Sequence, residues 1–217
     1  MYHYLDDKEF VSKMRTLCGE IMQDLCHILK EEYDIGSTFY LVGSGARNLI
    51  MQNINEPVDL DYNLEIIRCE DFEDCRYIKE CVRKAFNKAL NLNDLNDCED
   101  STSSLTSKPI YFTDGNDTEF KIDVCITVRD EDDIYYRLIH NKTGFVFYDE
   151  YYWNIAPDSK KIKEKVKYLK SCGKWNLVRQ QYERIKNMYL TYNDNNHPSF
   201  ICYVEAVNNV YNSRKSW

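Results

Sequence analysis

The first half of the chain alternates between segments with the apolar spacing of helices and segments with that of strands. Across residues 7–33, apolar side chains recur every three or four positions, as one buried helix face requires. Asp6 or Asp7 is suited to cap its first turn. A second pattern, at steps of four, predicts a helix over residues 71–92. The two stripes consist of Phe10, Met14, Leu17, Ile21, Leu25, Ile28, Ile78, Val82, Phe86 and Leu90.

Shorter segments between and after these helices have the composition of β-strands. Residues 37–42 (STFYLV) are rich in β-formers and end at a glycine, and residues 58–66 (VDLDYNLEI) alternate polar and apolar side chains. Residues 46–54 (ARNLIMQNI) predict a short helix between them. Residues 93–108 are polar, acidic and serine-rich, which favours a mobile loop. Two hairpins are predicted beyond it, pairing 109–114 with 118–128 and 134–140 with 145–153.

The pattern becomes entirely helical after Pro157. Residues 159–192 predict two helices divided near Cys172, and a third helix restarts around NHPSF, with Pro198 at a favoured first position. We therefore expect an α+β fold: a mixed sheet flanked by helices over residues 1–156, followed by an all-helical C-terminal domain over residues 157–217. The predicted buried positions of the last two helices are Val178, Tyr182, Ile185, Tyr189, Tyr192, Tyr203, Ala206, Val207, Val210 and Tyr211.

Composition places the chain among globular proteins. Its 217 residues are 43% apolar, with 18 tyrosines, which is enough for a substantial core. The first residues, MYHYLDDKEF, lack a basic region followed by an apolar run, and no apolar run approaches the ~20 residues of a membrane span. We expect a cytoplasmic protein without a membrane segment.

The cysteines do not point to a metal site or to thiol catalysis. There are nine of them, with no C-x-x-C pair, and the four histidines do not cluster with them. A zinc site needs tighter ligand spacing. The pattern fits reduced thiols that pack as small apolar residues.

Charge divides the chain unevenly. Residues 1–150 contain 16 basic and 31 acidic residues, a net charge of −15, whereas residues 151–217 contain 12 and 5, a net charge of +7. The chain therefore joins an acidic first part to a basic last part.

Two aspartates lie two positions apart on the strand predicted over residues 58–66. Because side chains alternate along a strand, Asp59, Asp61, Asn63 and Glu65 share one face. That face belongs to a half-exposed strand, or it faces a cleft. In a cleft, two neighbouring carboxylates repel unless a cation lies between them, and hard oxygen ligands suit Mg²⁺.

The VGSGARN segment before these aspartates has features of a phosphate site. A strand that ends in Gly-Ser-Gly and leads into a helix offers backbone N–H groups to an anion. Gly43 and Gly45 would let a triphosphate approach the backbone, Ser44 adds a hydroxyl donor, and Arg47 is able to reach a phosphate oxygen. The alternative is a tight turn that only needs small residues. The spacing matches neither a P-loop nor G-x-G-x-x-G.

A third acidic residue lies within an otherwise apolar strand pattern, EFKIDVCITV. Aspartate is poorly suited to strand interiors, so Asp123 is unexpected there. Beside Asp59 and Asp61 it would complete a three-carboxylate metal site and could accept a proton from an attacking hydroxyl. The alternative is an outward-facing polar position, which the neighbouring Lys121 also fits.

These segments, in this order, resemble the DNA polymerase β-like nucleotidyltransferase superfamily, in the manner of a small bacterial-type member. The matching motifs are VGS (42–44), VDLDY (58–62) and KIDVC (121–125), and the resemblance covers about residues 37–128. Small members often carry glycine where Asn48 stands. A helical domain after the catalytic sheet is common in this superfamily.

The resemblance implies a role for each matched residue. Gly43 and Ser44 would hold the β- and γ-phosphates of a nucleoside triphosphate, and Asp59 and Asp61 would bind two Mg²⁺ ions. Asp123 would bind the catalytic ion and help to activate the acceptor. The implied reaction transfers a nucleoside monophosphate to a hydroxyl group and releases pyrophosphate.

The acceptor stays open at this point. A small hydroxyl compound is favoured, and a protein side chain or a tRNA end is possible, whereas the chain looks short for members that make cyclic oligonucleotides. A non-catalytic nucleotide-binding protein, acting as a regulatory or toxin–antitoxin-type partner, is the alternative.

The basic last part of the chain has three interpretations. Lysines interleaved with aromatics bind nucleic acid, or form a solvated helix face over a core, or cover the cleft and supply positive charge near the triphosphate. We favour the last. The residues concerned are Lys160, Lys161, Lys163, Lys165, Lys167, Lys170, Tyr168, Trp175 and Tyr182.

Overall fold

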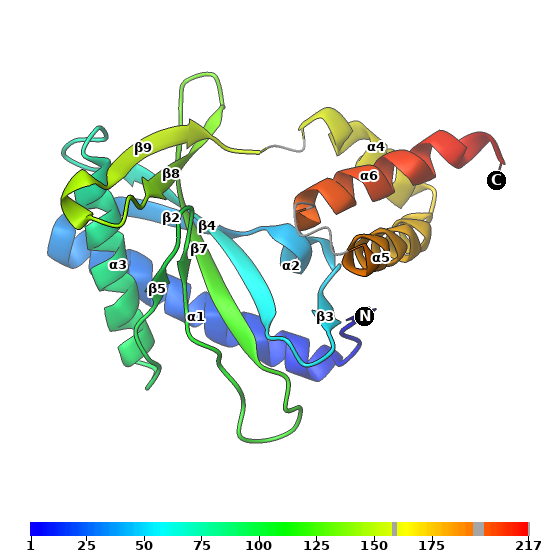
Figure 1. Ribbon diagram of the computed structural model, residues 1–217, viewed down its shortest axis with the longest axis horizontal. Helices are drawn as coiled ribbons and strands as arrows, with labels where there is room; N and C mark the ends of the chain where they lie inside the picture. Colours follow the sequence, from blue (N-terminus) through cyan, green and yellow to red (C-terminus); the bar gives the residue numbers. More distant parts are fainter. Residues whose placement is uncertain (158–159, 193–197, 217) are drawn as a thin grey trace.

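The computed structural model describes residues 1–157, 160–192 and 198–216 (Figure 1). Its centre is a mixed sheet with two long helices against one face and a group of helices at one end. This is the α+β architecture that the sequence predicts.

The main sheet contains the two strands that carry the aspartates. Its strands are β2 (Gly36–Leu41), β4 (Val58–Arg68), β5 (Glu99–Asp100), β6 (Leu105–Thr106), β7 (Phe120–Arg129), β8 (Tyr135–Asn141) and β9 (Glu150–Ile155). The order is β2-β4-β7-β6-β5, and β8 pairs with both β7 and β9. β4 and β7 are parallel neighbours, and the other pairs in this sheet are antiparallel. The second predicted hairpin is confirmed as β8–β9, with a short 3-10 turn, Val146–Tyr148, between its strands.

Two amphipathic helices bury one face of this sheet. They are α1 (Lys8–Tyr33) and α3 (Cys75–Asn91), close to the predicted ranges. The Asp7 side chain caps α1 by accepting a hydrogen bond from the Phe10 N–H, as one of the two predicted caps. Apolar side chains of both helices pack against alternate residues of β4 and β7, such as Leu60 and Ile122. The opposite, more polar face of β4 and β7 is left for other contacts.

A second hydrophobic cluster lies at the end of the molecule that carries the C-terminal helices (Figure 1). Its helices are α4 (Lys160–Ser171), α5 (Trp175–Thr191) and α6 (Ser199–Asn212), followed by a 3-10 turn, Ser213–Ser216. Leu49 and Met51 belong to the same cluster, so residues from the first part of the chain complete the helical core. The division into domains 1–156 and 157–217 therefore stays a prediction.

The first strand connects the C-terminal helices to the first part of the chain. β1 (Tyr2–Tyr4) pairs with β3 (Met51–Asn53) in a separate two-stranded sheet. The Asn187 side chain on α5 accepts a hydrogen bond from the Tyr2 N–H at 2.7 Å and donates one to the Tyr2 carbonyl at 3.0 Å. The position of α5 thus depends on the first residues of the chain.

The predicted helix over residues 46–54 is wrong. The helix, α2 (Gly43–Arg47), begins earlier and ends at Asn48, which has a left-handed φ of 58°. Residues 51–53 then form β3 instead, because β1 offers them a backbone partner. Long-range pairing overrides the local helical pattern.

The polar segment 93–108 is more ordered than predicted, because it contains β5 and β6. Leu105 is fully buried and pairs in register with Val124 of β7. Asp100 is held by the buried Lys79 at 3.0 Å and by the ring of His140 at 2.6 Å. The first predicted hairpin is reduced to one antiparallel bridge between Ile110 and Phe120.

The C-terminal helices follow the prediction with small differences. The break between α4 and α5 falls at Gly173, whose φ is +67°. Pro198 is the N-cap of α6 and not its first residue, and the NHPSF segment extends into residues outside the described range. Tyr192 is exposed, unlike the predicted buried stripe. Among the described helices, none combines the length and apolarity that crossing a bilayer requires.

Candidate active site

The register of β4 and β7 brings the predicted acidic residues together. Asp61 lies directly opposite Asp123 in the parallel ladder, and Asp59 lies opposite Lys121. Neighbouring strands are about 4.8 Å apart, and residues two apart on a strand share a face. Asp59, Asp61 and Asp123 therefore occupy one face of two adjacent strands, which are at the centre of the sheet in Figure 1.

All three carboxyl groups have pKa values above their ordinary range, chiefly because of burial. Burial, followed by the charge of Asp123, raises the pKa of Asp59 to about 6 and that of Asp61 to about 6. Burial also raises the pKa of Asp123, against the lowering effect of a hydrogen bond from Thr106. Asp59 has the most solvent-exposed surface of the three, so its hydration is only partly lost. A cation among these groups would relieve their repulsion.

The carboxylates of Asp59, Asp61 and Asp123 are ligands that suit magnesium, but they are not arranged as a complete metal site. Asp123 Oδ1 accepts a hydrogen bond from the Thr106 hydroxyl at 2.5 Å. Within residues 1–157, 160–192 and 198–216, no three His, Cys, Asp or Glu side chains already form a group that could hold a metal ion. The metal-binding role of Asp59, Asp61 and Asp123 therefore stays a prediction.

The glycine turn lies directly against Asp61. The Val42 N–H donates to the Asp61 carbonyl at 2.8 Å, which joins the end of β2 to β4 at this point. Gly43 has a φ of +60°, and a Cβ built on it would lie only 2.0 Å from Asp61 Oδ2. Position 43 therefore needs glycine, both for its backbone conformation and for the space that the Asp61 carboxylate occupies.

Position 45 also requires a small residue, but for a different reason. A Cβ at this position would lie 2.8 Å from Leu60 Cδ2 and 3.1 Å from Leu41 Cδ1, so the residue packs tightly on the sheet. Its carbonyl accepts a hydrogen bond from Arg15 Nη2 on α1 at 2.5 Å. Packing accounts for this glycine, and its predicted part in phosphate binding is untested. Ser44, between the two glycines, is half-buried.

Arg47 fastens the turn to the C-terminal helices. Its Nη1 donates to the Gly43 carbonyl at 2.6 Å, and its guanidinium carbon lies 4.5 Å from the ring centre of the buried Tyr203 on α6. Its charge also lowers the pKa of Asp61, though less than burial and the other aspartates raise it. Arg47 thus lies beside the site, and its contact with phosphate stays a prediction.

Lys186 on α5 is a site residue that the sequence interpretation missed. Its charge acts on both Asp59 and Asp61, and its Nζ lies 3.9 Å from the ring centre of Tyr2. Burial lowers the pKa of Lys186, and the nearby carboxylates oppose that shift. The basic character of the C-terminal part was the one signal for such a residue.

The lysines singled out in the sequence do not occupy that position. Lys160, Lys161, Lys163, Lys167 and Lys170 on α4 are exposed, whereas Lys165 is half-buried against α6 through Asn208. Of the aromatics, Tyr182 is buried in the helical core.

The raised pKa values predict that the site destabilises the protein at neutral pH. A carboxyl whose folded pKa lies above its unfolded value favours folding below about pH 4, and that contribution is lost as the pH rises through 6. Asp61→Asn, which cannot ionise, should therefore raise the free energy of unfolding by about 1–2 kcal/mol at pH 7.5, after allowance for solvent screening. The gain should shrink towards pH 4 in thermal unfolding measurements.

A matched control and a metal titration sharpen this test. Asp117→Asn removes the same charge from an exposed loop and should leave stability unchanged at both pH values. Millimolar Mg²⁺ should raise the melting temperature of the parent protein but not that of Asp61→Asn, because ligands stabilise the state that binds them. A lower stability of Asp61→Asn at pH 7.5 would contradict the electrostatic interpretation.

Comparison with known proteins adds evidence on the fold alone. No protein-family model matches the sequence, and no curated protein is significantly similar to it. Among solved structures, CdnC of E. coli MS115-1, determined with ATP, is 15% identical with a TM-score of 0.58. The match covers 94% of this chain and 61% of CdnC.

Two further structures agree with this match. The Elizabethkingia meningoseptica CdnE cyclic dinucleotide synthase, with GTP and Apcpp, is 13% identical over 88% of this chain and 68% of its own, with a TM-score of 0.52. Vibrio cholerae DncV bound to 3'-deoxy ATP is 12% identical over 84% of this chain and 61% of its own, with a TM-score of 0.52.

The chain thus spans about six- to seven-tenths of the length of the proteins it resembles. At this level of identity the likeness concerns architecture, and it extends through the C-terminal helices. This chain therefore shares the fold of these solved structures, in agreement with the α+β architecture that its sequence predicts.

Proposed function

We propose that this protein is a Mg²⁺-dependent nucleotidyltransferase, which transfers a nucleoside monophosphate from a nucleoside triphosphate to an acceptor hydroxyl. The observation that carries the proposal is the register of β4 and β7. It sets Asp61 beside Asp123, with Asp59 on the same face and the Gly43 turn in contact with Asp61.

In the proposed reaction, one bond forms and one bond breaks at the α-phosphorus of the nucleoside triphosphate. The acceptor oxygen forms a bond to the α-phosphorus, the bond from that phosphorus to the bridging oxygen of the β-phosphate breaks, and pyrophosphate leaves. When bound at Asp59, Asp61 and Asp123, two Mg²⁺ ions would offset the negative charge that develops on the attacking and leaving oxygens. Asp123 would accept the proton of the acceptor hydroxyl, and its raised pKa favours that role.

The triphosphate would bind between the glycine turn and α5. The backbone N–H groups of Gly43 and Ser44 follow β2 at the start of α2, where an anion is favoured. Lys186 on α5 brings a positive charge close to Asp59 and Asp61. Similar folds have been solved with ATP or with GTP, which supports a nucleoside triphosphate as the donor.

Lys186→Met should raise the KM for the triphosphate about tenfold and reduce kcat less, because it removes a charge that binds phosphate before and during the reaction. Lys167→Met is the matched control, since it removes the same charge from the exposed face of α4. Steady-state kinetics at varied triphosphate concentration would separate the two. An unchanged KM in Lys186→Met would exclude this lysine from the donor site.

We propose a small hydroxyl compound as the acceptor, with a protein side chain or a tRNA end as further possibilities. CdnE and DncV, which share the fold, are cyclic dinucleotide synthases. This chain spans only about two-thirds of CdnE, so the acceptor is not carried over from it. A second nucleotide is therefore included among the acceptors to be tested.

The deciding experiment incubates the protein with each of four α-labelled nucleoside triphosphates, Mg²⁺ and a cell extract. The parent protein should release pyrophosphate and label one class of product, and Asp59→Ala should not, whereas Asp117→Ala should act like the parent. Nucleotide binding without turnover would instead support the regulatory, non-catalytic alternative. Equal labelling by the parent and Asp59→Ala would overturn the catalytic assignment.

A further inference from the structure

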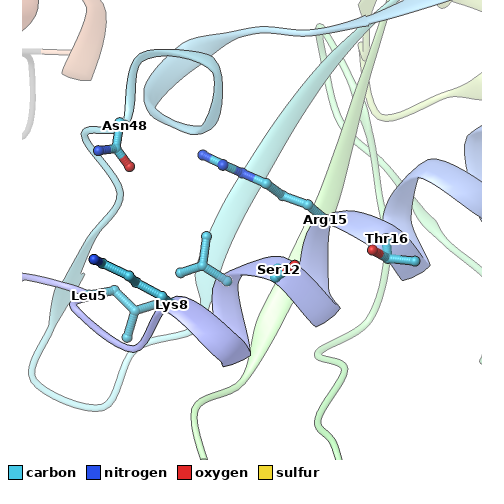
Figure 2. Close-up of a pocket in the computed structure, with 7 residues that line it drawn as sticks. Leu5, Lys8, Ser12, Arg15, Thr16 and Asn48 are labelled. Carbon is cyan, nitrogen blue, oxygen red and sulfur yellow. The ribbon is translucent and has the colours of Figure 1, made fainter.

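A surface hollow of about 420 Å³ lies on α1, and none of the three aspartates lines it. Lys8, Ser12 and Arg15 of α1 line it together with Asn48, and Leu5 and Val11 add an apolar wall. Figure 2 shows the Lys8 amine, the Arg15 guanidinium and the Asn48 amide approaching the same space from different sides. The volume is within the range of small-molecule sites.

The hollow is cationic in a part of the chain that is strongly acidic. Its lining includes two basic residues, Lys8 and Arg15, and no carboxylate. The nearest acidic residues in sequence are engaged elsewhere. Asp7 caps α1 and accepts a hydrogen bond from Asn116, and Asp6 lies 3.8 Å from Arg179. An anion would therefore meet attraction from two cations with no like charge among the lining residues.

Polar groups of the lining are accessible to a ligand. Lys8 and Ser12 are exposed, and Arg15 is half-buried between them and the glycine turn. An anion whose oxygens accept hydrogen bonds would therefore meet the Lys8 ammonium and the Ser12 hydroxyl directly, and charge-assisted hydrogen bonds of this kind are the stronger ones.

The hollow is connected to the candidate active site through Arg15. Its Nη2 donates to the Gly45 carbonyl in α2, the turn that also contains Gly43 and Ser44. Asn48, on the opposite wall, ends that turn, and its carbonyl accepts a hydrogen bond from Arg179 of α5 at 2.5 Å. A ligand that fixes Arg15 and Asn48 would thereby fix the turn and its contact with α5.

We propose that this hollow binds a small organic anion, a carboxylate or a phosphate ester with an apolar body, as an effector site separate from the donor-nucleotide site. The anionic group contacts Lys8, Arg15 and Ser12, and the apolar body contacts Leu5 and Val11. The effect of the ligand on turnover rests on the proposed function, whereas its binding does not.

Binding is tested with benzoate and phenyl phosphate as probes, and with benzyl alcohol as the neutral control. Isothermal titration should detect at least one of the two anions and no benzyl alcohol, and the better of the two identifies a carboxylate or a phosphate as the preferred group. Lys8→Met should weaken binding of that probe about tenfold or more. Lys13→Met, which removes the same charge from the exposed side of α1 where Lys13 pairs with Glu9, should not weaken it.

A competition experiment with ATP tests whether the probe binds outside the donor-nucleotide site. Saturating ATP with Mg²⁺ should not displace the probe, because the two sites are separate, although coupling through the glycine turn can change its affinity. Displacement by ATP, equal weakening by Lys13→Met, or no binding of either anion at 10 mM would overturn the proposal. If the parent protein binds the probe but transfers no nucleotide to any acceptor, the anion-binding site stands and the proposed enzymatic function fails, together with the effect of the ligand on turnover.

Discussion

Replacing Asp61 with asparagine is expected to lower nucleotidyl transfer by about 1000-fold, which is the scale of losing one main electrostatic group from a reaction centre. Asp61 lies opposite Asp123 in the strand register and directly against Gly43. Asparagine keeps the shape of the side chain but removes the charge that a metal ion and a triphosphate complex would require.

The Asp61→Asn substitution is informative because the stability of the protein should increase while its activity falls. Asp61→Asn removes a charge whose burial, together with the charge of Asp123, raises the pKa of the parent carboxyl to about 6, so the variant should be more stable at pH 7.5 while it loses activity. Pyrophosphate release and thermal unfolding, measured on the same preparations, check both parts. Asp117→Asn should change neither. Activity within tenfold of the parent would remove Asp61 from the mechanism.

Gly43→Ala should lower activity about 100-fold or more, because the new methyl group would occupy the position of the Asp61 carboxylate. A Cβ at residue 43 would lie 2.0 Å from Asp61 Oδ2 and 2.9 Å from its Cγ, so the carboxylate must move. A displacement of about 1 Å at a reacting centre can cost that factor. The left-handed φ of +60° adds a backbone cost of about 1–2 kcal/mol for alanine.

Gly173→Ala separates the two effects of that substitution. Gly173 has nearly the same backbone conformation, with a φ of +67°, but a Cβ there would have no atom within 4 Å. We expect Gly173→Ala to lose a similar amount of stability in denaturant titration and to keep its activity. If the two variants lose activity equally, backbone strain and not the Asp61 contact explains Gly43.

Local patterns were sufficient for the long strands β2, β4 and β7 and for the acidic face. Alternation along 58–66 placed Asp59 and Asp61 on one side, and the single acidic residue in a strand of apolar neighbours identified Asp123. These features depend on the two-residue period of a strand, which one sequence segment contains completely. The short glycine turn was predictable for the same reason.

Features that depend on distant partners were not predictable. Residues 51–53 have a helical local pattern and form a strand because β1 lies beside them. β5 and β6 are short and polar, and their place in the sheet is decided by β7 and by the contacts of Asp100. Lys186 resembles the other lysines of the basic part, and only the packing of α5 against the first strand brings it to the aspartates.

The hydrogen bonds between residue 2 and residue 187 also affect how the molecule is made. Because β1 is synthesised long before α5, the second core cannot close until α5 has been made. Contacts of such long sequence separation slow folding.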